Sequence, residues 1–148
     1  MKWRFLFSVL LIILFSCNKV SKYAVIPKIS FNSISLEQVK AGFDTTFFVY
    51  VNFEDGDGDI GFGSNNIYFI DTRDQDTVGY EIPGIPDRFE PKKGIQGSLE
   101  IEINAASLLL RNDSIHKERD TVIWNIYMID EAQHQSNIIA SKPVILTK

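Results

Sequence analysis

The chain has 148 residues, one cysteine and a formal net charge of −4, and 45% of its residues are hydrophobic. This length suits one domain with a real core, and the apolar fraction excludes wholesale disorder. A single cysteine excludes an intrachain disulfide and a thiolate zinc site. The acidic balance, without a basic stripe among the aromatics, argues against a nucleic-acid partner.

The N-terminus has the pattern of a secretion signal. A cationic head, Met1 to Arg4, precedes an apolar run of eleven residues, Phe5 to Phe15, which only Ser8 interrupts. Such a run is too short to span a bilayer, because a membrane helix needs about 20 residues. Its length and its flanks are typical of a signal peptide.

The apolar run ends in Leu14-Phe15-Ser16-Cys17, which resembles the lipobox of bacterial lipoproteins. The resemblance implies that residues 1–16 are a lipoprotein signal peptide and that Cys17 carries palmitate-like acyl chains. Several such chains anchor a protein firmly, since each buried CH₂ contributes about 0.8 kcal/mol. The alternative is an ordinary signal peptide followed by a chance cysteine.

Removal of residues 1–16 leaves 132 residues with 13 basic and 19 acidic side chains, a net charge of −6. The next segment is polar and has no clear period, so residues 17–26 are predicted to be the lipidated cysteine and a short tether. Residue 18 is not the aspartate that retains lipoproteins at the inner membrane, and residues 18–22 contain no acid. We therefore expect an outer-membrane, lipid-anchored protein that faces the periplasm.

Residues 27–148 read as short strands separated by turn clusters. The predicted strands are residues 28–34, 45–53, 66–71, 98–104, 121–129 and 137–146. The clearest is 45–53, where Phe47, Val49, Val51 and Phe53 share one face. Residues 121–129 are apolar on both faces and predict a central strand. Pro143 marks the last segment as an edge or bent strand.

Only Ala105 to Arg111 looks helical, and the segment 78–97, rich in proline and glycine, is predicted to be a long irregular loop. Such a loop is either functional or an ordered connection without a partner. Short strands without βαβ alternation predict an all-β fold, a single immunoglobulin-like antiparallel β-sandwich of two sheets.

The segment Glu54-Asp-Gly-Asp-Gly-Asp-Ile-Gly61 concentrates four carboxylates directly after a predicted strand. Glycines let the backbone bend tightly, so Asp55, Asp57 and Asp59 can turn toward one point. Ca²⁺, which takes about six to eight oxygen ligands, suits such a loop, and Asp130 is the first candidate for a further ligand. The alternative is a solvated turn without a metal, because Asp and Gly are turn formers.

The loop begins like an EF-hand, but Ile60 and Asn66 stand where that motif needs Gly and Glu, so it is not an EF-hand. His116 and His134 belong to no metal or catalytic pattern, and the sequence contains no nucleophile elbow and no P-loop. No residue is therefore selected as catalytic.

Three segments together resemble small uncharacterised lipoproteins of Bacteroidetes-type bacteria: Phe53 to Gly61, Ile126 to Asp130, and Ser136-Asn137. The resemblance implies an immunoglobulin-like β-sandwich in the cell envelope and no established activity. The turn after Asp130 departs from that family's pattern.

We expect a non-enzymatic binding or structural module, anchored in the membrane by its lipid and stabilised by Ca²⁺, whose partner is another envelope protein or a glycan. The alternative is an enzyme or enzyme accessory that acts on envelope polysaccharide or peptidoglycan. A cleft with convergent titratable residues would favour the alternative.

Overall fold

The computed structural model describes residues 21–61, 64–89, 93–111 and 115–148, so the leader and Cys17 lie outside the described residues. No helix in these ranges is long and apolar enough to cross a membrane. The strands are β1 (Lys28–Ile34), β2 (Gln38–Lys40), β3 (Thr46–Asp55), β4 (Asn65–Asp71), β5 (Thr77–Glu81), β6 (Ile95–Asn104), β7 (Arg119–Val122), β8 (Trp124–Met128), β9 (Ile139–Ala140) and β10 (Val144–Thr147). Two short 3-10 helices, η2 (Asp87–Phe89) and η4 (Ala105–Ser107), complete the described elements.

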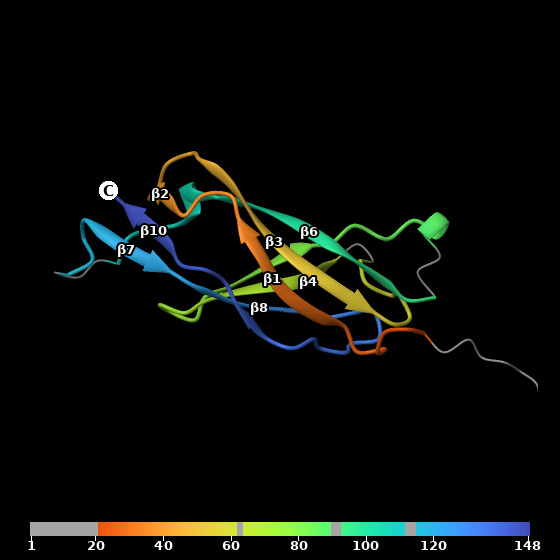
Figure 1. Cartoon of the computed structure of the whole chain (residues 1–148). Coiled ribbons are helices and arrows are strands. Elements are labelled where there is room, and N and C mark those ends of the chain that lie inside the picture. Colours follow the sequence, from red (N-terminus) through yellow and green to blue (C-terminus); the bar gives the residue numbers. More distant parts are fainter. Residues whose placement is uncertain (1–20, 62–63, 90–92, 112–114) are drawn as a thin grey trace, which may run out of the picture.

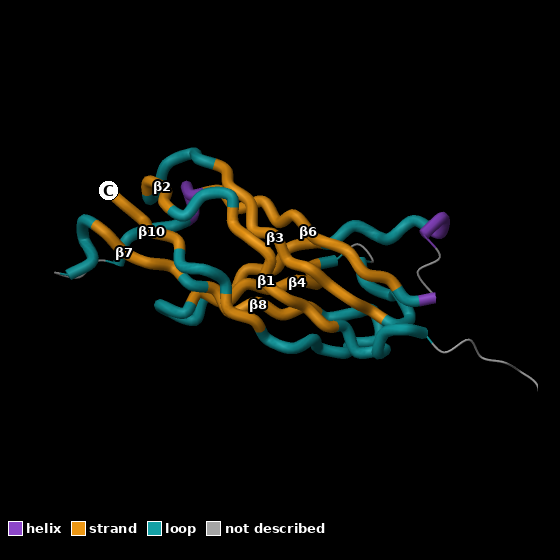
Figure 2. Tube along the Cα trace, in the orientation of Figure 1, coloured by secondary structure: helices purple, strands orange, loops and turns teal. Residues whose placement is uncertain are grey.

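The strands form three small sheets, in the orders β1-β3-β6, β5-β4-β8-β9 and β2-β10-β7. The first two face each other as layers, and the third extends one end of the domain (Figure 1; Figure 2). Neighbouring strands are antiparallel except β2 and β10, which are parallel. The protein is an all-β sandwich, as the sequence predicts.

The core lies between the two larger sheets. The predicted inward face of β3 is confirmed, since Phe47, Val49, Val51 and Phe53 are all buried. The rings of Phe47, from β3, and Phe69, from β4, lie 6.3 Å and 6.2 Å from that of Trp124 in β8. These contacts fill the space between the layers, and burial of large aromatic side chains is a main source of stability in such a fold.

The predicted helix over 105–111 is wrong, because only Ala105–Ser107 form one 3-10 turn. The side chain of Asn104 accepts the N–H of Ala106, and the N–H of Leu108 returns to the carbonyl of Ala105. Leu108 then adopts an extended conformation and is buried. The helix therefore ends where Leu108 packs into the core. A helix of about two turns is too short to be stable through local propensity alone.

The segment 78–97 is more regular than predicted, because it contains most of β5 and the start of β6. Gly79 lies opposite Tyr68 in the β4–β5 pair, and the ring of Tyr80 packs edge-on against Phe69 at 5.2 Å. Backbone pairing with β4 thus makes residues 78–81 a strand, although their local sequence pattern predicts an irregular loop.

The predicted strand 121–129 is instead two strands, β7 and β8, which are separated by Ile123 and belong to different sheets. At the break, the N–H of Trp124 donates to the Ser141 hydroxyl, and the N–H of Ser141 donates to the Trp124 carbonyl. The last predicted strand is likewise split into β9 and β10 around residues 141–143, where Pro143 stands. β2 is too short for the sequence to predict.

Candidate metal centre

Asp55 is the last residue of β3 and continues its inward face. The alternation that buries Phe53 also directs Asp55 into the interior, where its side chain is 0% exposed. The acidic loop, Glu54 to Gly61, then turns back, and Gly58 takes a φ of +70° that suits glycine. Ile60 returns to the core and is buried. The loop is therefore held at both ends, by Asp55 and by Ile60.

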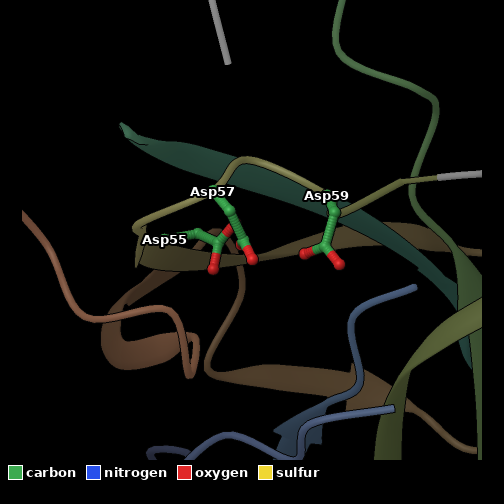
Figure 3. A group of neighbouring side chains, drawn as sticks. All are labelled: Asp55, Asp57 and Asp59. Carbon is green, nitrogen blue, oxygen red and sulfur yellow. The ribbon is translucent and has the colours of Figure 1, made fainter. Parts of the chain in front are cut away.

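The three predicted aspartates converge. Asp55, Asp57 and Asp59 each place a carboxylate oxygen within 4.8 Å of the others, and Figure 3 shows the carboxylates on one side of the loop. Ligands on opposite sides of a Ca²⁺ ion lie roughly 4.6–5.2 Å apart, twice the Ca–O distance. One ion could therefore touch all three side chains.

Several of these oxygens lack the partners that buried polar atoms normally have. Both carboxylate oxygens of Asp55 are buried without a hydrogen-bond partner, and so is one oxygen each of Asp57 and Asp59. Burial, and then the charge of Asp57, raises the pKa of Asp55 to about 6. Burial also raises the pKa of Asp59. The site thus holds closely spaced carboxylates, and four of their buried oxygens have no hydrogen-bond partner among the described residues.

The late loop, residues 130–134 after β8, lies against the acidic loop. The N–H of Glu131 donates to the Asp59 carbonyl at 3.1 Å, and the N–H of Ala132 donates to the Asp59 carboxylate at 3.1 Å. Asp130 is fully buried and close enough for its charge to raise the pKa of both Asp55 and Asp59. The predicted neighbourhood of Asp130 and the acidic loop is therefore present.

Asp130 does not belong to the trio of converging carboxylates. Its Oδ1 accepts the backbone N–H of His134 at 2.7 Å, and its Oδ2 lies 2.9 Å from His134 Nδ1. Each carboxylate oxygen has more than one lone pair, so these bonds leave room for a further interaction. Its role as a metal ligand stays a prediction.

Sequence reasoning missed three features of this end of the domain. The first is the contact between His134 and Asp130. Their spacing of four residues fits a tight loop as well as a helix, so the spacing alone does not predict the contact. The backbone N–H of Ala132, which holds Asp59, has no signature in the sequence. Gly56 is required because a Cβ there would lie 2.6 Å from the carbonyl oxygens of Tyr23 and Ala24.

No protein-family model, no curated protein and no solved structure shows significant similarity to this chain. The functional conclusion therefore rests on the chain's own residues.

Proposed function

We propose that the chain is a lipid-anchored, non-enzymatic module of the bacterial cell envelope, and that Asp55, Asp57 and Asp59 bind one Ca²⁺ ion. The observation that carries the metal site is Asp55, a fully buried carboxylate with two unpartnered oxygens beside two further aspartates. An ionised carboxylate without a partner is costly to bury, and a bound cation removes that cost.

Calcium fits this donor set better than other divalent ions. The donors are hard carboxylate oxygens, whereas zinc and copper favour imidazole and thiolate ligands. Mg²⁺ demands a near-ideal octahedron, while Ca²⁺ accepts the irregular arrangements that a loop provides. We propose that Asp130 supplies a further oxygen, from the late loop, and that water completes the shell.

The metal would act as a structural clamp. The acidic loop follows β3 in one layer, and the late loop follows β8 in the other. An ion that holds Asp55 to Asp59 in place, with the Asp59–Ala132 bond beside it, would close this end of the sandwich. Ordering of the end loops suits a module whose role is to bind or support another envelope component, a protein or a glycan.

The lipid anchor is the second part of the proposal, supported by the Leu-Phe-Ser-Cys17 sequence after the apolar leader. We further propose that the protein lies in the outer membrane and faces the periplasm, because residue 18 is not aspartate and residues 18–22 contain no acid. Mass spectrometry of the purified N-terminus tests it: the expected species begins at Cys17 and carries acyl chains. An intact Met1, or an unmodified Cys17 thiol, would rule out the anchor.

Thermal melting in millimolar Ca²⁺ against chelator tests the metal site. Binding to the folded state alone adds about 1.4 kcal/mol at ten times Kd, which should raise the Tm by a few degrees. Asp57→Asn should lose this shift. Asp76→Asn, which neutralises an exposed aspartate in the β4–β5 turn, should keep it. Equal melting of the wild type with and without calcium would mean that the acidic loop is only a turn.

A further inference from the structure

The N-terminal segment 21–26 is packed against the acidic loop. Gly56 lies so close to the carbonyls of Tyr23 and Ala24 that a Cβ would not fit, and Gly94 is in the same way close to the Ser21 hydroxyl. Figure 1 shows residues 21–26, the end of β3 and η2 at one end of the sandwich, with β2, β7 and the C-terminus at the other. The chain therefore enters the domain at the end that holds the metal centre.

The length of chain before this entry point restricts how an anchored domain can stand. Ser21 follows Cys17 by four positions, a span of at most about 14 Å. β3 alone has 10 residues, which extend over roughly 30 Å between the two ends of the sandwich. A lipid on Cys17 thus brings the entry end to the membrane surface and keeps the opposite end away from it.

We infer that the entry end of the sandwich, formed by residues 21–26 and η2, rests on the lipid headgroups of the membrane. This inference depends on the proposed lipidation of Cys17. The occupant of this surface is the bilayer itself, because the short connection leaves little room for another layer between them.

The side chains at this end suit a bilayer interface. Val25 and Ile26, in the entry segment, are 48% and 56% exposed, and Phe89, in η2 at the same end of the sandwich (Figure 1), is 58% exposed. Exposed large apolar side chains gathered at one end of a domain mark an interaction surface. The Lys22 ammonium lies 5.0 Å from the ring centre of Tyr23, and the Arg88 guanidinium 4.8 Å from that of Phe89. Aromatic rings and long cationic side chains are favoured at headgroup level, where the cations meet lipid phosphates.

The acidic loop lies at the same end and would by itself be repelled by anionic lipids. A Ca²⁺ ion on Asp55, Asp57 and Asp59 would remove most of that repulsion. The orientation and the metal centre are therefore compatible, although the orientation does not require the metal.

The opposite end of the domain provides a matched control. Phe43, between β2 and β3, is 52% exposed and carries the Lys40 ammonium 4.1 Å from its ring centre. It thus repeats the cation–aromatic pair of Arg88 and Phe89 at the far end of β3. Phe89→Trp and Phe43→Trp place the same probe in the same chemistry at the two ends.

The experiment uses the processed, lipidated protein that begins at Cys17 and so lacks Trp3, reconstituted into vesicles of phosphatidylethanolamine and phosphatidylglycerol with brominated acyl chains. The buried Trp124 gives a background that the wild type measures. We expect bromine to quench the added fluorescence of Phe89→Trp, with a blue-shifted emission, and to leave that of Phe43→Trp unchanged. Equal quenching of both variants, or quenching of neither, would overturn the inference.

Mass spectrometry of the same preparation separates this inference from the proposed anchor. If Cys17 is acylated and Phe89→Trp is not quenched, the anchor stands and the orientation is wrong. If Cys17 is not acylated, both are wrong.

Discussion

Ala132 and Asp59, which are 73 positions apart in the chain, are joined by a hydrogen bond of 3.1 Å from the Ala132 N–H to the Asp59 carboxylate. The bond connects the acidic loop, which follows β3, with the late loop, which follows β8. Because these strands belong to opposite layers, any ligand that fixes Asp59 also fixes one layer to the other. A metal at this site should therefore stabilise the whole sandwich.

The metal-free protein should lose stability as the pH rises toward neutral. Burial, and then the charge of Asp57, raises the pKa of Asp55 to about 6, above the unfolded value of about 3.9. The folded state therefore holds this proton more tightly, so its stabilising effect is present below about pH 4 and is lost as the pH rises through about 6. Urea unfolding in chelator across this range should show the decline.

Asp55→Asn is the matched variant for this pH effect, because it keeps the shape of the side chain and removes its titration. Its free energy of unfolding should decline less between about pH 4 and pH 7 than that of the wild type. Identical slopes for the two proteins would show that Asp55 has an ordinary pKa in the folded state.

Asp120 should contribute strongly to stability at neutral pH. Its buried carboxylate lies 2.8 Å from Arg111 Nη2 and 3.1 Å from Arg73 Nη1. Burial alone would raise its pKa, but hydrogen bonds from Arg111, from the Thr121 N–H and from Arg73 together hold the pKa well below the usual range. This contribution is therefore present above about pH 4 and is lost as the pH falls below that value.

Asp120→Asn should lower the free energy of unfolding by about 3 kcal/mol at pH 7, because it breaks a buried ion pair. Chemical denaturation measures the loss. The exposed Asp76→Asn, with the same change of charge, should cost less than about 0.5 kcal/mol. A similar cost for both variants would mean that the network around Asp120 adds little.

The Asn137 side chain should hold β1, an edge strand of its sheet, in place. Its side-chain oxygen accepts the N–H of Ile29 and its amide donates to the Ile29 carbonyl, each at 2.9 Å. Asn137→Ala leaves both backbone groups without this partner and should cost about 1–2 kcal/mol. Asn137→Asp keeps only the acceptor, so its free energy of unfolding should lie between those of Asn137→Ala and the wild type. If urea unfolding shows Asn137→Ala to be as stable as the wild type, the two hydrogen bonds to Ile29 do not stabilise β1.

Gly56→Ala tests the contact between the acidic loop and residues 21–26. The added methyl would lie 2.6 Å from the carbonyl oxygens of Tyr23 and Ala24, so one of the segments must move. We expect trypsin to cleave after Lys22 faster than in the wild type, with a loss of stability of about 1–3 kcal/mol. Unchanged cleavage would indicate that residues 21–26 are not held by this contact.

The sequence predicts the parts of this protein that local pattern determines. The alternation through Phe47 to Phe53 predicts the buried face of β3, and the aspartates after it predict a cluster at its end. The break at Ile123 could not be predicted, because Ser141 creates it from 17 positions along the chain from Trp124. The His134 contact with Asp130 likewise depends on how the late loop folds, which the spacing alone does not determine.

The most direct test of the central claim is a calcium titration followed by the backbone amide signals in NMR spectra. The account predicts saturable shifts at Gly58 and Ala132, with a Kd of about 10⁻⁴ to 10⁻³ M, as is common for extracellular modules. Asp57→Asn should weaken binding at least about tenfold, which is 1.4 kcal/mol, whereas Asp76→Asn should bind as the wild type does. If calcium leaves these amides unmoved in the wild type, or moves them equally in Asp57→Asn, the three aspartates do not form a calcium site.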